Sequence, residues 1–237
     1  MNIALIIAGG SGHRMHQSIP TQFLTVNDRP VIVYTLEAFQ RHPEIDEIAV
    51  VCIEGWEAVL RTYANQFNIT KLKLIVPGGE NGQSSIRNGV YALEKDHALD
   101  DIVLIHDAIR PMVSAQIISD CIEVTKKFGC AISAIPCAEA MMQTEDGRVS
   151  TGSYPRERLK RTQTPQAFSL KTICDLHRRA LKEGITNSVA SCTLMIELGG
   201  QVYFSMGSEK NIKLTTVDDL DIFKALLAVK RMDWLKE

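Results

Sequence analysis

The chain has 237 residues, of which 45% are hydrophobic and 23% charged, and its formal net charge at pH 7 is −2. These values are ordinary for one α/β domain with a substantial core, and they disfavour nucleic acid or an anionic membrane as a partner held by general positive charge. The N-terminus has no basic stretch before its short apolar run, and no run reaches the ~18 apolar residues that cross a membrane, so we expect a cytoplasmic protein.

Apolar runs of strand length alternate with helical patterns through the first half of the chain. Residues 2–8 are apolar on both faces, which predicts a buried strand, and further strands are predicted at 47–52, 72–76, 102–106 and 130–135. The spacing of apolar residues predicts helices between them, at 31–41, 55–66, 84–95 and 114–128. This β–α–β alternation is typical of an α/β fold with a mostly parallel sheet and helices on both faces.

The alternation breaks between residues 137 and 162, where Asp146-Gly147 is a turn signal between short polar strands. We therefore predict an arm, 137–162, that projects from a single domain spanning residues 1–237. The remaining chain predicts an amphipathic helix from Ser169 to Gly184, a strand at 201–205 and a last helix opened by a Thr216-x-x-Asp219 capping motif. None of the six cysteines forms a C-x-x-C pair, which favours reduced, buried thiols over a zinc site.

The first strand runs directly into Ala8-Gly9-Gly10-Ser11-Gly12-His13-Arg14-Met15. Glycines let backbone N–H groups approach an anion, and ligands bind at the carboxyl ends of strands in open α/β sheets. Met15 stands where the dinucleotide fingerprint needs a small residue, which disfavours an NAD-dependent oxidoreductase, and no lysine follows Gly12 as a P-loop requires. What remains is a glycine loop with an arginine, suited to a triphosphate; the alternative is a plain turn with a solvated arginine.

Two further segments at strand ends carry polar groups. In Ile105-His106-Asp107-Ala108-Ile109-Arg110-Pro111, a carboxylate facing a triphosphate could hold Mg²⁺ through oxygen, or the aspartate could simply cap a helix. We expect His106 to be structural. The glycine-rich turn from Pro77 to Ser85 could accommodate a base and a ribose, or be a flexible turn with Ser84 or Ser85 as the helix cap.

Two later segments are basic. Four basic side chains lie between residues 156 and 161, before Thr162-Gln163-Thr164-Pro165-Gln166, and could dock a phosphate or form a solvated charge run. Lys213 follows the late strand in Asn211-Ile212-Lys213-Leu214-Thr215, which slightly favours a functional lysine over a surface one.

Together, and in this order, these segments resemble the cytidylyltransferase family of methylerythritol-phosphate and ribitol-phosphate enzymes. The matches are AGGSGHRM, the Gly-Gly…Ser loop, HDAIRP, the Arg-…-TQTPQ-F run and NIKLTT, which span Ala8 to Thr216. The resemblance implies a Rossmann-like, nucleotidyltransferase-type sheet with a β-arm that interlocks the two subunits of a homodimer. It also implies CTP and a polyol phosphate as substrates, with Mg²⁺ as cofactor.

The resemblance further implies a role for each matching residue. CTP would lie over Ala8, Gly9, Gly10 and Gly12, with Gly79 and Ser85 near cytosine and ribose. Asp107 would hold Mg²⁺ beside the phosphates, and the catalytic cations at the α-phosphate would be Arg14 and Lys213. The acceptor-binding residues would be Arg110, Arg156, Thr164 and Thr186, with Arg110 reaching the acceptor of the partner subunit.

The chain departs from the family pattern at three places. Thr21 replaces a lysine that follows the glycine loop, so that another cation, Lys210 or Arg87, is a candidate for its role. Glu139-Ala140 and Asn187 replace an Asp-Thr pair and an aspartate on the acceptor side. These two changes favour ribitol 5-phosphate or a related alditol phosphate, for a surface polysaccharide, over 2-C-methyl-D-erythritol 4-phosphate of isoprenoid synthesis. The rivals are a nucleotidyltransferase for another base or a sugar 1-phosphate, and a non-catalytic CTP-binding protein.

Overall fold

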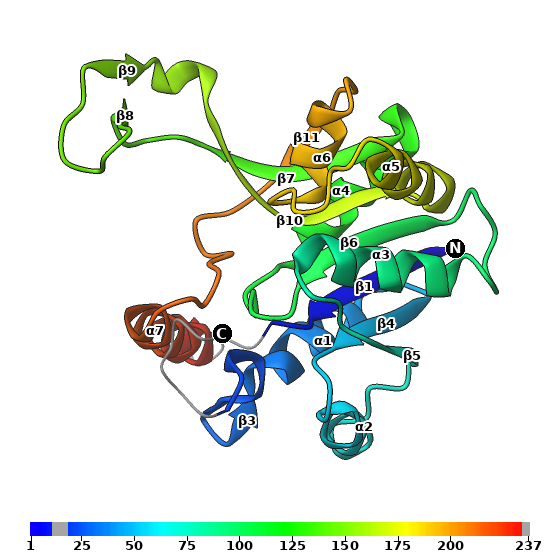
Figure 1. The fold of residues 1–237 in the computed structure, drawn as a ribbon. Helices are drawn as coiled ribbons and strands as arrows, with labels where there is room; N and C mark the ends of the chain where they lie inside the picture. Colours follow the sequence, from blue (N-terminus) through cyan, green and yellow to red (C-terminus); the bar gives the residue numbers. More distant parts are fainter. Residues whose placement is uncertain (11–18, 234–237) are drawn as a thin grey trace.

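The computed structural model describes residues 1–10 and 19–233, and its centre is a seven-stranded sheet (Figure 1). The strand order is β11-β7-β10-β6-β1-β4-β5. Strand β10 runs antiparallel to both neighbours, whereas the other adjacent pairs are parallel. The strands are β1 (Asn2–Ala8), β4 (Glu47–Cys52), β5 (Leu72–Pro77), β6 (Ile102–Asp107), β7 (Cys130–Pro136), β10 (Lys160–Ser169) and β11 (Phe204–Met206).

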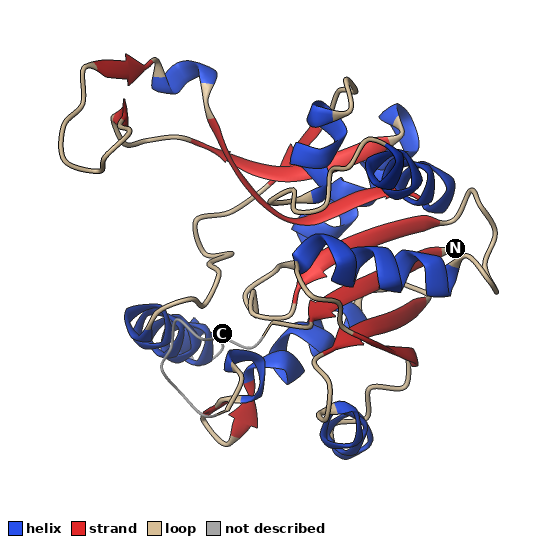
Figure 2. Cartoon of the chain, in the orientation of Figure 1, coloured by secondary structure: helices blue, strands red, loops and turns tan. Residues whose placement is uncertain are grey.

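Helices cover both faces of the sheet, because successive side chains of a strand point in opposite directions (Figure 2). In β1, Ala4 and Ile6 pack into one buried cluster and Ile3 and Leu5 into the other. The first cluster is completed by α1 (Val31–Arg41), α2 (Glu57–Gln66) and α4 (Ala115–Phe128). The second is completed by α3 (Gly82–Leu93), α5 (Leu170–Lys182) and α6 (Ser191–Glu197). The α/β fold with a mostly parallel sheet is therefore confirmed.

The last helix, α7 (Val217–Asp233), packs beside the sheet rather than on it. Phe223 joins a small cluster with Val26 of β2 (Thr25–Val26) and with Val31, the first residue of α1. Strand β2 lies in the chain between η2 (Thr21–Phe23) and β3 (Arg29–Pro30). The predicted capping motif is confirmed at the start of α7. The Thr216 backbone nitrogen donates to the Asp219 carboxylate at 2.7 Å, and the Asp219 nitrogen donates to the Thr216 hydroxyl at 3.2 Å.

A hairpin arm stands away from the body of the molecule (Figure 1). Strands β8 (Met141–Gln143) and β9 (Gly152–Tyr154) pair antiparallel, and η3 (Arg156–Arg158) leads from the arm into β10. The expected turn is present, since Gly147 has a φ of +72° and the Asp146 carboxylate accepts from the nitrogens of Arg148 and Val149. The arm exposes large apolar side chains, namely Met141, Met142, Val149 and Tyr154.

Most predicted elements are confirmed, and the differences have physical reasons. The interior strand β10 was not predicted, because its first half is polar; its buried Gln163 and Gln166 are held by hydrogen bonds instead of apolar packing. Helix α3 begins at Gly82 and is capped by Asn81, not by a serine of the turn. The late strand begins at residue 204, not 201. Within the described ranges, no helix combines the length and the apolar character needed to cross a membrane.

Candidate active site

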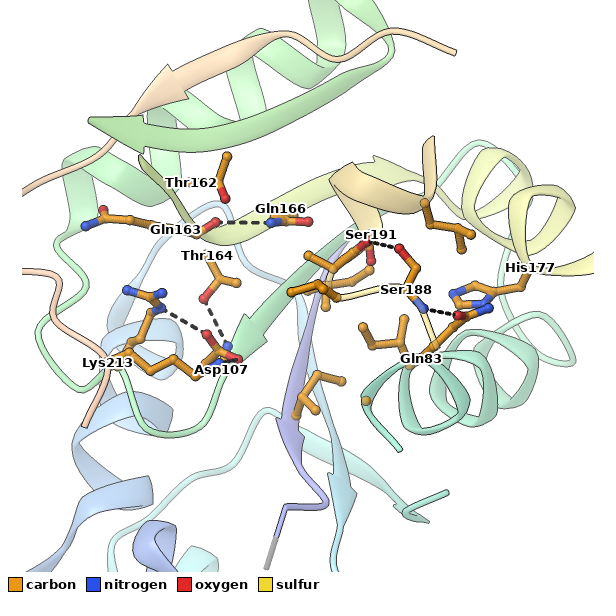
Figure 3. A pocket seen from close by; sticks show the side chains of 18 residues that line it. Gln83, Asp107, Thr162, Gln163, Thr164, Gln166, His177, Ser188, Ser191 and Lys213 are labelled. Carbon is orange, nitrogen blue, oxygen red and sulfur yellow. Dashed lines mark hydrogen bonds and ion pairs between the residues drawn. The ribbon is translucent and has the colours of Figure 1, made fainter. Parts of the chain in front are cut away.

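Two pockets adjoin at the carboxyl ends of β1 and β6, the edge at which open α/β sheets bind ligands. The glycine-loop pocket, of about 320 Å³, is lined by Ala8–Gly10 and by the turn between β5 and α3. The inner pocket, of about 260 Å³, lies between β10, α3, α5 and the start of α6 (Figure 3). Asp107 and Lys213 line both pockets and therefore mark the place where two bound molecules would meet.

Asp107 is held between two cations. Its Oδ1 accepts from Lys213 Nζ at 3.1 Å, and its Oδ2 accepts from Arg110 Nε at 2.9 Å. Burial alone raises the pKa of the Asp107 carboxyl, but Lys213 and Arg110 outweigh burial and hold the pKa below its ordinary value. The carboxylate is consequently ionised at neutral pH, and its side chain, 20% exposed, is open to the pockets.

A chain of hydrogen bonds fixes the backbone around Asp107. His106 is fully buried, and burial lowers its pKa to about 4 despite the opposing charge of Asp107, so its imidazole is neutral. Since His106 Nε2 lies 3.2 Å from the Arg110 carbonyl, which only accepts, that nitrogen carries the proton. His106 Nδ1 then accepts from the Thr164 hydroxyl at 3.1 Å, and the hydroxyl oxygen accepts from the Asp107 nitrogen at 3.0 Å. The hydroxyl proton of Thr164 is thereby already used within the protein.

The segment that carries Lys213 is tied to β10 by buried amides. The Asn211 side chain donates to the Thr164 carbonyl at 2.9 Å and to Gln163 Oε1 at 3.3 Å. Gln163 in turn bonds the backbone of Ser208 through both ends of its amide, at 2.8 and 3.1 Å. Arg110 Nη1 donates to the Asn211 carbonyl at 2.8 Å. These contacts hold the lysine and the aspartate at a fixed separation, although 106 positions separate them in the chain.

The glycine-loop pocket is shaped by close backbone contact and by one buried side chain. A Cβ atom on Gly78 would lie 3.3 Å from the Cα of Gly9, so a side chain at Gly78 would push the two loops apart by a few tenths of an ångström. The Gln22 amide donates to the carbonyls of Ala8 and Gly10, at 2.8 and 2.9 Å. Gln22 therefore fixes the start of the loop in which backbone groups would face phosphates.

The turn between β5 and α3 forms the opposite wall. The Gly79 nitrogen donates to the Ser85 hydroxyl at 3.0 Å, and a Cβ on Gly79 would lie 2.4 Å from the Ser84 hydroxyl. Asn81 and Ser84 form a capping box that starts α3 beside the pocket. Both expected contact residues for the base and ribose, Gly79 and Ser85, line this pocket.

Charge in the two pockets is sparse. Thr21, in the position where the family pattern has a lysine, lines the glycine-loop pocket and is buried. Neither Lys210 nor Arg87, the candidate replacements, lines either pocket. Among the described residues, Arg110 and Lys213 are the basic side chains that line them.

The other expected site residues are placed as follows. Arg110 lines the inner pocket of its own chain, where its guanidinium donates to Asp107, and Thr164 lines the same pocket. Arg156 lies at the foot of the arm and donates to the Ala138 carbonyl at 2.7 Å, and Thr186 is exposed. Neither residue lines the glycine-loop pocket or the inner pocket. The predictions for Gly12 and Arg14 lie outside the described residues.

Sequence reasoning missed Gln22, the side chain of Asn211, and His177 and Ser191, which line the inner pocket. Gln22 directly follows Thr21, and a polar residue beside a glycine loop was the available signal for it. Asn211 lies inside the NIK match, but that pattern indicated a role for the charged lysine and not for the amide of Asn211. Nothing in the sequence singles out His177 from the other residues of its amphipathic helix.

A family model described as IspD, 2-C-methyl-D-erythritol 4-phosphate cytidylyltransferase, matches residues 2–229. The ribitol-5-phosphate cytidylyltransferase of Lacticaseibacillus paracasei is 42% identical over 234 residues, which cover 98% of this chain and 100% of that protein. A 2-C-methyl-D-erythritol 4-phosphate cytidylyltransferase of Clostridium botulinum is 36% identical over 227 residues, 95% of this chain and 97% of that protein. The crystal structure of 4-diphosphocytidyl-2C-methyl-D-erythritol synthase from Anaerococcus prevotii matches with a TM-score of 0.80 at 25% identity, over 96% of this chain and 98% of that one. The chain therefore belongs to the IspD family of cytidylyltransferases, and it is a nucleotidyltransferase.

Proposed function

We propose that the protein transfers CMP from CTP to ribitol 5-phosphate or a closely related alditol phosphate and releases pyrophosphate. The observation that carries this proposal is the position of Asp107 and Lys213 on the wall shared by the two pockets. A nucleotide in the glycine-loop pocket and an acceptor in the inner pocket would bring their phosphates together at these two side chains.

The reaction requires little covalent chemistry from the protein's side chains. An oxygen of the acceptor phosphate attacks the α-phosphorus of CTP, a new P–O bond forms, and the bond to the β-phosphate oxygen breaks to release pyrophosphate. The attacking phosphate is already ionised near pH 7, so no side chain has to remove a proton. The protein contributes alignment of two polyanions and preorganised positive charge at the α-phosphate.

The described residues suit these tasks. Lys213 is 39% exposed on the shared wall, which leaves its ammonium group accessible to the α-phosphate. Asp107 is an ionised, partly exposed carboxylate, the kind of single oxygen ligand that Mg²⁺ uses together with substrate phosphates. When bound, the metal would neutralise charge on the triphosphate. We assign Arg14 a second catalytic charge at the α-phosphate, and Arg156 and Thr186 a place at the acceptor.

Two observations favour an alditol phosphate as the acceptor. The ribitol-5-phosphate cytidylyltransferase of Lacticaseibacillus paracasei is 42% identical to the chain, against 36% for the methylerythritol-phosphate enzyme of Clostridium botulinum. In addition, Ala140 and Asn187 replace residues of the acceptor side in the family pattern. With an alditol phosphate as the acceptor, we propose that the product is a precursor for polysaccharide synthesis.

We further propose a cytoplasmic homodimer joined through the arm. The arm exposes four large apolar side chains on a two-stranded hairpin that has little core of its own, and such a surface is a common site of subunit contact. Arg156 lies at the foot of this arm, where a partner's pocket could use it. The cytoplasmic location is supported by the six cysteines, which are all free and buried.

The test is a pyrophosphate-release assay with purified protein, CTP and Mg²⁺, and with ribitol 5-phosphate, 2-C-methyl-D-erythritol 4-phosphate and a sugar 1-phosphate as alternative acceptors. We expect the highest kcat/KM with ribitol 5-phosphate and no turnover with UTP, ATP or GTP in place of CTP. Turnover with methylerythritol phosphate alone would reverse the proposed acceptor. Binding of CTP without pyrophosphate release from any acceptor would identify a non-catalytic CTP-binding protein.

A further inference from the structure

Two polar side chains at the far end of the inner pocket have no hydrogen-bond partner within the described structure. His177 is 1% exposed and Ser191 is 3% exposed, and neither ring nitrogen of the histidine nor the serine hydroxyl is bonded. Both residues line the pocket. Buried polar groups are nearly always paired, so two unpaired groups in one cavity point to a molecule that pairs with them.

Two buried amides of this pocket already have partners within the protein. Gln83 donates to the Ile185 carbonyl and accepts from the Ser188 nitrogen, each at 2.7 Å. Gln166 accepts from the Cys192 nitrogen at 3.0 Å and donates to the Gln163 carbonyl at 3.3 Å. Each end of both amides therefore has a partner within the protein, unlike the polar atoms of His177 and Ser191.

The two ends of the pocket differ in chemistry. Figure 3 shows Asp107 and Lys213 at one end, and His177 and Ser191 toward the opposite side. The first end carries charge and the second is neutral, because burial, assisted by Arg87, lowers the pKa of His177 to about 4. A neutral imidazole has one donor and one acceptor, and a serine hydroxyl has both, which is the pairing that alcohol groups need.

We propose that the far end of the inner pocket binds the hydroxyl-bearing carbon chain of the acceptor, with His177 and Ser191 as residues that select for its hydroxyl groups. The proposal rests on the proposed function, since it places the acceptor's phosphate at Asp107 and Lys213 and directs its chain away from the nucleotide. The volume of about 260 Å³ is at the lower end of ligand pockets, which suits a small polyol phosphate. A site whose polar groups are paired by substrate hydroxyls discriminates against analogues that lack them.

The test compares Ser191→Ala with Tyr91→Phe. Each variant removes one buried hydroxyl that has no partner, but only Ser191 lines the pocket. Ser191→Ala is expected to raise KM for ribitol 5-phosphate about 3- to 10-fold, the effect of one neutral hydrogen bond, with KM for CTP within about twofold of wild type. Tyr91→Phe is expected to change neither KM. His177→Leu is expected to act in the same direction as Ser191→Ala.

Two further measurements separate recognition from a structural effect. The preference for ribitol 5-phosphate over glycerol 3-phosphate, whose shorter chain has fewer hydroxyls, should fall in Ser191→Ala by the same 3- to 10-fold factor. The melting temperature of Ser191→Ala should equal or exceed that of wild type, because the variant removes an unpaired buried hydroxyl. The hydroxyl site alone would be overturned if the wild type turns over ribitol 5-phosphate and Ser191→Ala has the same acceptor KM and the same preference for ribitol 5-phosphate over glycerol 3-phosphate. Failure of the wild type to turn over any polyol phosphate would overturn the proposed function, and the hydroxyl site with it.

Discussion

Replacing Lys213 by methionine should separate catalysis from stability. Methionine keeps the unbranched, apolar part of the side chain but removes the charge that we assign to the α-phosphate. Deleting one preorganised group that stabilises transition-state charge typically costs about 10²- to 10³-fold in rate. We therefore expect kcat/KM for CMP transfer to fall by that factor. The Lys213 ammonium lies 3.1 Å from Asp107 Oδ1, on the wall that the two pockets share.

The expected cost in stability is much smaller. Lys213 is 39% exposed, so water screens its attraction to Asp107, and ion pairs of this kind contribute about 0.2–1 kcal/mol. The carboxylate is not left alone in the variant, since Arg110 still donates to it at 2.9 Å. A loss of about 1 kcal/mol lowers the melting temperature of a chain of this size by roughly 2–4 °C.

The assay is pyrophosphate release with CTP, Mg²⁺ and ribitol 5-phosphate, paired with thermal unfolding followed by circular dichroism. Lys210→Met is the matched control, because this lysine precedes Lys213 by three positions, is exposed and lines neither pocket. The control should keep wild-type activity. A folded Lys213→Met protein with kcat/KM within about threefold of wild type would refute the role of this charge.

Three other predictions concern the surroundings of the site. Thr164→Val should lower the free energy of unfolding, measured by urea denaturation, by about 1–3 kcal/mol, because the Asp107 nitrogen and His106 Nδ1 would both lose their hydrogen-bond partner. An unchanged free energy of unfolding would mean that the Thr164 hydroxyl serves only a ligand. Gln22→Leu should weaken CTP binding about tenfold in calorimetric titration, since the two hydrogen bonds that fix the glycine loop are lost; an unchanged dissociation constant would contradict that function. The third is acid sensitivity: His106 and His177 have pKa values of about 4 in the folded state against 6.5 when unfolded, so their contribution is complete above pH 6.5 and is lost as the pH falls toward 4. At pH 5 each should have lost about 2 kcal/mol, and a free energy of unfolding that stays constant between pH 7 and 5 would contradict their neutral burial.

The elements of the sheet were predictable where burial alone decides them. Residues 2–8 are apolar on both faces, and the strand Asn2–Ala8 follows because an interior parallel strand tolerates little else. Strand β10 was missed for the opposite reason. Its polar residues are satisfied by partners far along the chain, such as Ser208 for Gln163, and periodicity in one segment carries no information on such partners.

The site was predictable to the extent that it lies at strand ends. Asp107 ends β6, and the edge of the sheet at which it lies follows from the fold class. The meeting of Asp107 with Lys213 was expected only through resemblance, because no local rule joins residues so distant in the chain. The unpaired state of His177 and Ser191 was beyond prediction, since it depends on which groups remain without a partner after the whole chain has folded.

The central claim is that one nucleotide and one acceptor meet at Asp107 and Lys213. The most direct test is a crystal structure with a non-hydrolysable CTP analogue, Mg²⁺ and ribitol 5-phosphate. We predict cytosine against the turn containing Gly79 and Ser85, the α-phosphate within hydrogen-bonding distance of Lys213 Nζ, and the metal on the Asp107 carboxylate. A nucleotide whose α-phosphate lies far from Lys213, or an acceptor outside the inner pocket, would contradict the account.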